Sequence, residues 1–346
     1  MENGRHLLVI RLSAMGDVAM TVPVIKSLLD AYPDLKVTVL TKKFLVPIFN
    51  GLERVNVHVA DVSGKHKGVF GLWKLYQELK VLKIDAVADL HNVLRSNILK
   101  QYFRLDRIPF IQIDKGRKEK KALTAEKNRV FKQLKTTHQR YADVFSQMGY
   151  PFNLTINNYL PKRTLPNFIL DTVGSDSRKW VGIAPFAAFS GKMYPLELME
   201  QVVRDLNSTN QYKILLFGGG QKEKELLDSW AVTYNDCLSV VGKLTLEEEL
   251  ALISNLDVMV SMDSGNAHLA ALFGIPTITL WGVTHPFAGF YPYGQDLDNA
   301  LLSDRTNYPL IPTSIYGNKV PKGYENVMTS IDPEDILEKI IFLLNA

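Results

Sequence analysis

The sequence contains one cysteine, Cys237, among 346 residues. A single cysteine excludes an intrachain disulfide and fits a reducing compartment. The long stretch without Asp, Glu, Lys or Arg, residues 264–295, holds three prolines and five glycines, which excludes a membrane-spanning helix there. The first apolar run, Leu7–Ile10, is too short for the core of a signal peptide. We therefore expect a cytoplasmic protein.

Low-complexity sequence is also lacking, because the 22 glycines and 16 prolines together make up only 38 of the 346 residues. With 46% hydrophobic and 22% charged residues, the chain has the composition of a globular protein and not of a disordered one. Single hydrophobic cores stop growing at roughly 250–300 residues. The length therefore predicts two domains.

Short apolar runs alternate with longer segments of helical period, which is typical of a parallel sheet covered by helices. The expected strands are residues 7–11, 36–40, 55–59, 85–90 and 110–113, and then 180–184, 212–217, 238–240, 258–261 and 277–280. The expected helices are residues 22–31, 72–82, 93–103 and 137–148, and then 196–207, 222–230, 246–254 and 265–273. We predict an α/β protein with two Rossmann-like doubly wound domains, residues 1–163 and 164–330, and a terminal helix in residues 331–346 docked on the body.

Positive charge is concentrated in one segment. The formal net charge is +4, yet residues 114–140 contain ten basic residues and three acidic ones, so the rest of the chain is net negative. One basic segment on an otherwise slightly acidic protein indicates an anionic partner at one place. The aromatics here are Phe131 and, just beyond it, Tyr141, and no nucleic-acid-binding module is present, so we expect no nucleic-acid partner. The alternative is an ordinary solvated surface run.

The first candidate functional loop, residues 11–18, follows the first expected strand. Ligands of open parallel sheets bind outside the carboxyl ends of the strands, and Asp17 is the one carboxylate in this loop. Gly16 allows the backbone to approach a ligand closely. Asp17 is either a helix N-cap or a free carboxylate, since Thr21 is a competing cap. A single glycine does not make a dinucleotide-binding fingerprint.

The second candidate segment, residues 258–276, is a buried strand, a turn and a helix. Free amides at the helix start predict an anion site, formed by Ser264, Gly265 and Asn266. Asp263 either caps the helix or accepts hydrogen bonds from sugar hydroxyls. His268 lies one turn into the helix, where a histidine is either structural or part of the anion site.

A third loop, residues 185–195, follows the first strand of the second domain and contains Lys192. A lysine that faces an anion site can neutralise a leaving phosphate, whereas the alternative is a solvated surface lysine. A glycine turn, residues 218–220, follows the next strand. It is equally consistent with a functional loop and with a tight connection between two elements.

Taken together, these segments resemble the heptosyltransferase family of lipopolysaccharide inner-core assembly, along nearly the whole chain. The most specific matches are Ser13-Ala14-Met15-Gly16-Asp17-Val18, Asp89-Leu90-His91-Asn92-Val93-Leu94-Arg95-Ser96 and Asp263-Ser264-Gly265-Asn266-Ala267-His268-Leu269-Ala270-Ala271. Gly282-Val283-Thr284-His285-Pro286 and the turn at residues 292–294 resemble the loop that follows in the family.

The resemblance implies an inverting glycosyltransferase of the GT-B type, with two domains facing a cleft and with neither a metal nor a cofactor. The donor, a nucleoside-diphosphate sugar such as ADP-heptose, would bind the second domain, and a lipid-linked core saccharide would bind the first. Asp17 would be the catalytic base. The implied donor-binding residues are Ser190, Lys192, Asp263, Ser264, Gly265, Asn266 and His268. The implied acceptor-binding residues are Ser13, Met15, Gly16, His91, Arg95 and Ser96.

The chemistry of transfer agrees with these roles. A hydroxyl is a poor nucleophile near neutral pH, so a carboxylate such as Asp17 that takes its proton would contribute about 10²–10⁴ in rate. Without a divalent cation, Lys192 and the helix amides would meet the charge of the leaving diphosphate. We expect residues 115–135 to contact phosphates of the acceptor or anionic headgroups, so that the enzyme is peripheral at the inner membrane. The alternative function is a non-catalytic sugar-nucleotide-binding or regulatory protein of the same fold.

Overall fold

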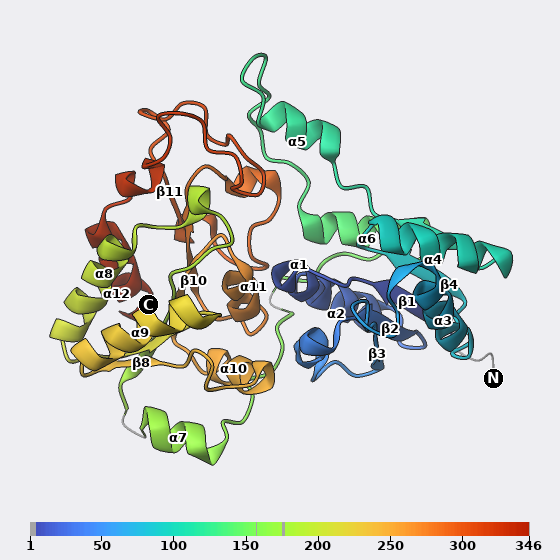
Figure 1. The fold of residues 1–346 in the computed structure, drawn as a ribbon, viewed down its shortest axis with the longest axis horizontal. Coiled ribbons are helices and arrows are strands. Elements are labelled where there is room, and N and C mark those ends of the chain that lie inside the picture. The colour runs from blue at the N-terminus through green and yellow to red at the C-terminus, as the bar shows by residue number, and fades with distance from the viewer. Residues whose placement is uncertain (1–4, 157, 175–176, 346) are drawn as a thin grey trace. The chain divides into compact units, whose positions relative to one another are not determined.

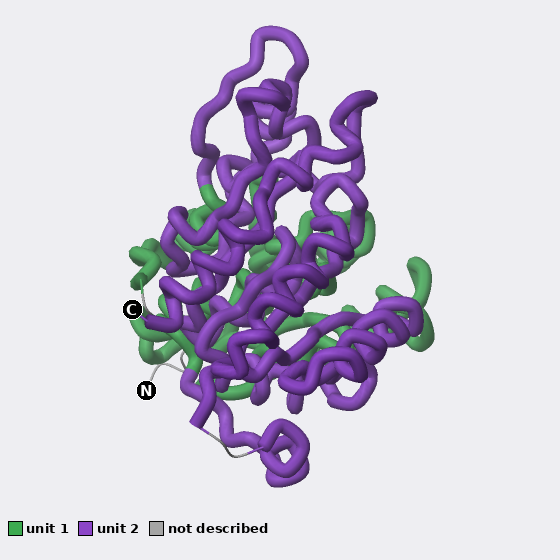
Figure 2. The backbone as a smooth tube through the Cα atoms, turned by 90° about the vertical axis from the view of Figure 1, so that its left-hand side faces the viewer, with its two compact units in different colours: residues 1–115, 136–160 green, residues 116–135, 161–346 purple. Residues whose placement is uncertain are grey.

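The computed structural model describes residues 5–156, 158–174 and 177–345, and the chain divides into two compact units (Figures 1 and 2). Unit 1 comprises residues 1–115 and 136–160, and unit 2 comprises residues 116–135 and 161–346. Each unit is built on its own parallel sheet. The predicted α/β class with two parallel-sheet domains is therefore confirmed. None of the helices in the described part of the chain has the length and hydropathy that a bilayer crossing requires.

The sheet of unit 1 has the strand order β3-β2-β1-β4-β5, and every neighbouring pair is parallel. The strands are β1 (His6–Ile10), β2 (Lys36–Thr41), β3 (Val55–Val59), β4 (Ala86–Asp89) and β5 (Phe110–Gln112). The chain leaves β1 toward β2 on one side and reaches β4 on the other. The topological switch point of unit 1 therefore lies between β1 and β4.

Helices cover both faces of this sheet (Figure 1). One face is covered by α3 (Gly68–Lys80) and α4 (Leu94–Leu105), and the other by α2 (Thr21–Ala31) and α6 (Thr137–Gln147). A short helix, α1 (Met15–Ala19), and a 3₁₀ segment at residues 43–49 complete the unit. The residues that α3 buries, Leu72, Leu75, Tyr76 and Leu79, have the helical spacing that places them on one side.

The sheet of unit 2 has the strand order β11-β10-β9-β6-β7-β8 and is also parallel throughout. The strands are β6 (Lys179–Ala184), β7 (Tyr212–Leu216), β8 (Cys237–Ser239), β9 (Val258–Met262), β10 (Thr277–Trp281) and β11 (Ala300–Leu302). Here the switch point lies between β6 and β9. The sequence did not predict β11, a three-residue strand at the edge of the sheet.

The core of unit 2 lies between the sheet and α8 (Leu196–Ser208), α9 (Gln221–Thr233) and the terminal helix α12 (Pro333–Asn345). The connections place α10 (Leu246–Ile253) and α11 (Gly265–Ala271) on the other face. α7 (Asn167–Val173) begins directly after Pro166. The carboxylate of Asp332 accepts a hydrogen bond from the Glu334 amide at the start of α12, and this helix buries its own residues Ile336 and Ile340.

Residues 116–135, placed by the sequence in the first domain, belong to unit 2 instead (Figure 2). Leu123 and Leu134, on either side of a charged run, pack with Ala288 in a small hydrophobic cluster. The Leu134 amide donates to the Phe287 carbonyl at 2.9 Å. In the sequence, the many basic residues of this segment draw attention away from its few apolar anchors. The expected domain boundary at residue 163 therefore does not account for the packing of residues 116–135 on unit 2.

Two cation–π contacts strengthen this attachment. The guanidinium of Arg305 lies 3.6 Å from the ring centroid of Phe131, and the ammonium of Lys120 lies 4.0 Å from that of Phe290. Lys120, in helix α5 (Arg117–Leu123), is only 8% exposed. Not every lysine of the basic segment therefore faces solvent.

A Phe131→Ala variant is expected to loosen residues 116–135 from unit 2, because Phe131 contacts Arg305, Phe287 and His285. Since Phe131 is only half-buried, the free energy of unfolding should fall by less than the roughly 3–5 kcal/mol typical of a buried Phe→Ala change. Hydrogen exchange of amides 117–134 should become faster. The exposed neighbour Lys132, changed to Ala, is the control, and unchanged exchange in Phe131→Ala would refute the attachment.

Candidate active site

Both units place their candidate loops at the switch point of their sheet. In unit 1 the Asp17 loop follows β1 and the His91 loop follows β4, and these strands are neighbours. In unit 2 the Lys192 loop follows β6 and the Asp263 segment follows β9, which are neighbours as well. Because the carboxyl ends of parallel strands meet at one edge, loops far apart in sequence come together there.

Asp17 is the third residue of α1, and its carboxylate is bound at the start of that helix. One oxygen, Oδ2, lies 2.6 Å from Nη2 of Arg11 and accepts the Ala14 amide at 3.3 Å. Thr21 does not cap a helix, because its hydroxyl donates to the Val18 carbonyl. The side chain of Asp17 is 28% exposed. The carboxylate is thus held on one side and open to solvent on another.

Arg11 is a site residue that the sequence reasoning missed. It is buried at the end of β1, donates to the Leu90 carbonyl at 2.7 Å and pairs with Asp17. Burial by itself lowers the pKa of Arg11, but the interactions with Tyr141 and with the Asp17 carboxylate outweigh burial and raise it. The available signal was a charged residue directly after the apolar run Leu7–Ile10, although this position does not show where the guanidinium points.

The loop after β4 is organised by Asp89, which is fully buried. Its carboxylate accepts hydrogen bonds from the amides of His91 and Asn92, each at 2.9 Å, and from the side chain of Gln112. Nδ1 of His91 lies 3.4 Å from the Leu12 amide, which links the two loops of the switch point. Burial and the nearby Arg11 charge lower the pKa of His91 to about 3. His91 is therefore neutral at physiological pH.

The other expected acceptor residues differ in accessibility. Arg95 is exposed at the start of α4. Ser13, in the loop after β1, and Met15 and Gly16, at the start of α1, are half-buried. Ser96 is fully buried, and its hydroxyl both accepts the Val93 amide and donates to the Val93 carbonyl. In this structure the Ser96 hydroxyl stabilises the first turn of α4, so it is not available to a ligand.

In unit 2 the structure brings Lys192 and Asp263 together. Nζ of Lys192 lies 2.5 Å from the Asp263 carbonyl oxygen and 3.3 Å from its carboxylate. Both side chains are mostly buried. The alternative that Asp263 caps α11 is not observed: no side chain caps that helix, and the Ser264 hydroxyl pairs with that of Ser261. Lys192 is therefore not a solvated surface lysine.

Glycines fix the loop that presents Lys192. A Cβ on Gly191 would lie 2.7 Å from the Gly317 carbonyl oxygen and from a methyl group of Val283. A Cβ on Gly282 would lie 2.3 Å from the Gly191 carbonyl oxygen. The Val283 amide donates to that same carbonyl at 2.8 Å. These close backbone contacts, which the sequence did not reveal, hold Lys192 beside Asp263.

The remaining residues expected to bind the donor are close to Lys192 or Asp263 in the sequence. Ser190 is exposed in the same loop, Ser264 and Gly265 begin α11, and His268 is buried one turn later. The side-chain oxygen of Asn266 is buried, with no hydrogen-bond partner in the described part of the chain. No three His, Cys, Asp or Glu side chains of the described residues gather as a metal site would require.

Comparison with known proteins assigns the family. Residues 72–312 match the model of glycosyltransferase family 9 (heptosyltransferase). The chain belongs to this family. Among similar proteins, the lipopolysaccharide core heptosyltransferase OpsX of Haemophilus influenzae is 26% identical over 87% of this chain and 85% of its own length. Lipooligosaccharide heptosyltransferase 2 of the same organism is also 26% identical, over 98% of this chain and 99% of its own. The protein is thus a glycosyltransferase.

Solved family 9 structures share the fold. A family 9 glycosyltransferase from Veillonella parvula has a TM-score of 0.76 at 20% identity, over 100% of this chain and 98% of its own. The heptosyltransferase II of Escherichia coli has a TM-score of 0.69 at 18% identity, over 98% of both chains. The fold, with two parallel-sheet domains, is that of these heptosyltransferases.

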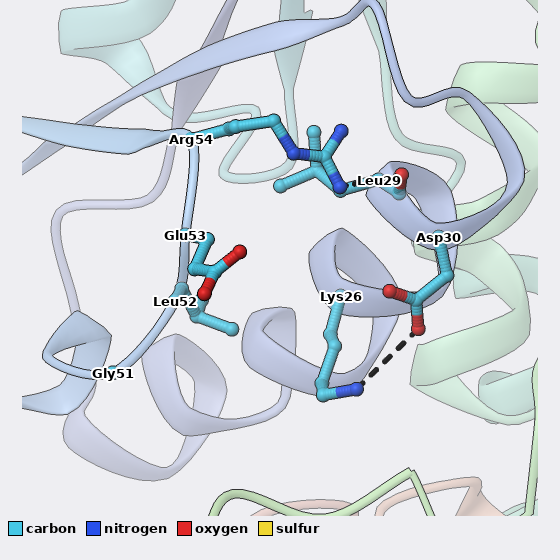
Figure 3. A pocket seen from close by; sticks show the side chains of 7 residues that line it. All are labelled: Lys26, Leu29, Asp30, Gly51, Leu52, Glu53 and Arg54. Carbon is cyan, nitrogen blue, oxygen red and sulfur yellow. Dashed lines mark hydrogen bonds and ion pairs between the residues drawn. The ribbon is translucent and has the colours of Figure 1, made fainter.

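A pocket of about 260 Å³ in unit 1 of this glycosyltransferase lies away from the candidate site (Figure 3). Its lining residues are Lys26, Leu29, Asp30, Gly51, Leu52, Glu53 and Arg54. It lies where α2 ends and β3 is about to begin, which is the amino edge of the sheet. Arg54 donates to the carbonyls of Leu29, Tyr32 and Pro33. This pocket therefore belongs to the end of a helix, opposite the edge that holds Asp17.

Proposed function

We propose that the protein is an inverting, metal-independent heptosyltransferase that transfers heptose from ADP-heptose to a lipopolysaccharide core acceptor. The observation that supports it most directly is that Asp17 and Lys192 each follow the first strand of a sheet, at its switch point. The relatives named as lipopolysaccharide and lipooligosaccharide heptosyltransferases support the sugar and the acceptor. Structures of Escherichia coli WaaC with ADP and with ADP-2-deoxy-2-fluoro heptose support the nucleotide.

Asp17 would act as the general base. As the acceptor hydroxyl oxygen forms a bond to the anomeric carbon, its proton passes to the Asp17 carboxylate. The pairing with Arg11 fixes this carboxylate through one oxygen, and the partial exposure of the side chain leaves room for the hydroxyl. A positioned base of this kind contributes about 10²–10⁴ in rate.

Lys192 would stabilise the leaving group. The bond from the anomeric carbon to the diphosphate breaks as the new bond forms, and its electron pair stays on the phosphate oxygen. Attack opposite to that oxygen inverts the anomeric carbon. The mostly buried ammonium of Lys192 would meet the charge that develops, where the low local dielectric strengthens the interaction. The amides of Ser264 and Gly265 would assist it.

The donor sugar would be held by the side chains next to Lys192. The buried, unpartnered oxygen of Asn266 is an acceptor that a sugar hydroxyl would satisfy. The Asp263 carboxylate has lone pairs beyond the one that Lys192 uses, and we place Ser190 and His268 on the same side. On the acceptor side, the exposed guanidinium of Arg95 suits the carboxylates and phosphates of a core saccharide.

The experiment that tests the proposed function combines the purified chain with ADP-heptose and a lipid-linked core acceptor in the presence of a chelator. We expect a heptosylated product whose anomeric configuration, read by NMR, is opposite to that of the donor. A product with retained configuration would contradict direct displacement. Tight binding of ADP-heptose without any product would instead favour the non-catalytic sugar-nucleotide-binding protein.

The basic segment, residues 115–135, would bring this enzyme to an anionic membrane surface on the cytoplasmic side. Lys118 and Lys121 are exposed on α5, whereas Lys120 is buried against Phe290 and is not a headgroup contact. The placement of the segment on unit 2 leaves its outer lysines accessible to headgroup phosphates.

A Lys118→Gln/Lys121→Gln variant is expected to bind phosphatidylglycerol-containing vesicles about fivefold more weakly for each lysine removed, since one lysine near an anionic surface contributes about 1 kcal/mol. Co-sedimentation at low salt measures the change. Lys222→Gln/Lys322→Gln removes two exposed lysines elsewhere in unit 2 and is the control. Equal binding of the two variants would show that the basic segment is an ordinary solvated surface.

A further inference from the structure

An exposed apolar cluster lies at the start of α3, outside the residues used above. Val69, Phe70 and Trp73 are 55%, 86% and 40% exposed. Trp73 follows the other two by four and three positions, so the three side chains share one side of the helix. That side differs from the one that α3 buries against the sheet. Adjacent large apolar side chains left in water indicate an interaction site.

The cluster is built on a packed base. The ring of Trp73 lies 5.0 Å from that of Tyr102, nearly perpendicular to it, and 5.2 Å from that of Tyr76. The Tyr102 hydroxyl donates to the Val69 carbonyl at 3.1 Å. The first turn of α3 is therefore fixed to α4, which lies beside it (Figure 1). The Trp73 ring is held in place, so it would lose little conformational entropy on binding.

Lysines surround this cluster. A Cβ on Gly71 would lie 2.4 Å from the His66 carbonyl carbon, so the preceding loop packs directly on the first turn of α3. Lys65 in this loop pairs with Glu78 at 2.5 Å. Lys67 is exposed in the same loop, and Lys74 is exposed one residue after Trp73. Lys67 and Lys74 therefore flank the three apolar side chains with positive charge.

We infer that this cluster anchors the protein to an anionic lipid bilayer. Phe70, Val69 and the exposed edge of Trp73 would enter the boundary between headgroups and acyl chains, where aromatic side chains are favoured. The lysines would extend along the surface toward the phosphates. A second copy of this chain is a poorer occupant, because it would bring the same lysines against one another.

The cluster also lies at the functional edge of unit 1. Since α3 follows β3, its first turn is at the carboxyl edge of the sheet, the edge that holds the Asp17 and His91 loops. A bilayer bound at this edge would present a lipid-linked acceptor to those loops. This orientation rests on the proposed function, whereas the binding of the cluster to lipid does not.

The test uses the full chain with vesicles of phosphatidylcholine and phosphatidylglycerol, and with vesicles of phosphatidylcholine alone. Phe70→Ser is expected to lower partitioning into the anionic vesicles by at least about tenfold, because burying a Phe side chain contributes more than one factor of ten. Lys67→Gln should lower it about fivefold. The matched control is Val81→Ser, which removes a side chain that is 78% exposed at the other end of α3 and should change nothing.

Four results would overturn the inference. They are no binding of the wild type to anionic vesicles, binding by Phe70→Ser equal to that of the wild type, no blue shift of Phe70→Trp fluorescence on adding vesicles, and a wild-type dimer that Phe70→Ser dissociates.

Transfer assays separate this inference from the proposed function. Phe70→Ser should keep its rate with a lipid-free acceptor and lose rate with acceptor in vesicles. A wild type that binds vesicles but transfers to neither acceptor would refute the function alone.

Discussion

An Asp17→Asn variant is expected to transfer sugar about 10²–10⁴ times more slowly than the wild type while binding donor almost as tightly. The amide keeps the size of the side chain and an oxygen that can accept from Arg11, but it cannot take a proton from the acceptor hydroxyl. The donor residues belong to unit 2, and Asp17 belongs to unit 1. The loss should therefore appear in kcat and not in the affinity for ADP.

Transfer rates and calorimetric titration with ADP measure these two quantities. Asp30→Asn is the matched control, because Asp30 is also in unit 1 and also pairs with a cation, Lys26, but at the amino edge of the sheet. Thermal unfolding should show both variants folded. An Asp17→Asn enzyme that turned over within a few-fold of the wild type would exclude Asp17 as the base.

A Lys192→Met variant is expected to lower kcat by about 10²–10³, the usual cost of removing one preorganised group that stabilises transition-state charge. Methionine keeps an unbranched apolar stem like that of lysine and removes the ammonium, which lies 2.5 Å from the Asp263 carbonyl. The charge of the leaving diphosphate grows as the bond breaks. The effect on kcat should therefore exceed the effect on donor affinity.

Single-turnover kinetics with saturating donor isolate the chemical step. Lys179→Met is the control, since it removes another Lys–Asp pair of unit 2, that of Lys179 with Asp257 at 3.2 Å, at the start of β6 and mostly exposed. It should leave kcat unchanged. A Lys192→Met enzyme that lost donor affinity but kept kcat would assign Lys192 to ground-state binding alone.

Local pattern predicted most of the fold. Each expected strand is present within one or two residues, because strands buried in a parallel sheet are short apolar runs that need no partner to be noticed. The pattern missed β11 and the short helices α1, α5 and α7. Short elements hold few positions to show a period, and those of similar length that were predicted, such as α11 and β8, stand in the regular alternation of strands and helices.

Chain order was sufficient to place three candidate residues near strand ends. Asp17 follows β1 in unit 1, whereas Lys192 and Asp263 follow β6 and β9 of unit 2, each at the carboxyl edge of its own sheet. Arg11 was missed, because nothing in the sequence says that its buried guanidinium turns toward Asp17. Ser96 was placed on the acceptor side, yet its hydroxyl is used within α4. The roles of Asp17 and Lys192 stay predictions until the variants are measured.

The sequence by itself determined the α/β class, the two parallel sheets and the loops that hold the candidate residues, because periodicity and strand-end position are properties of neighbouring residues. Only the tertiary structure decided which lysines of the basic segment face solvent and which unit that segment joins. Leu134 meets Phe287, and Lys120 meets Phe290, across a long stretch of chain. Such contacts depend on the shapes of surfaces formed after folding, and no local pattern encodes them.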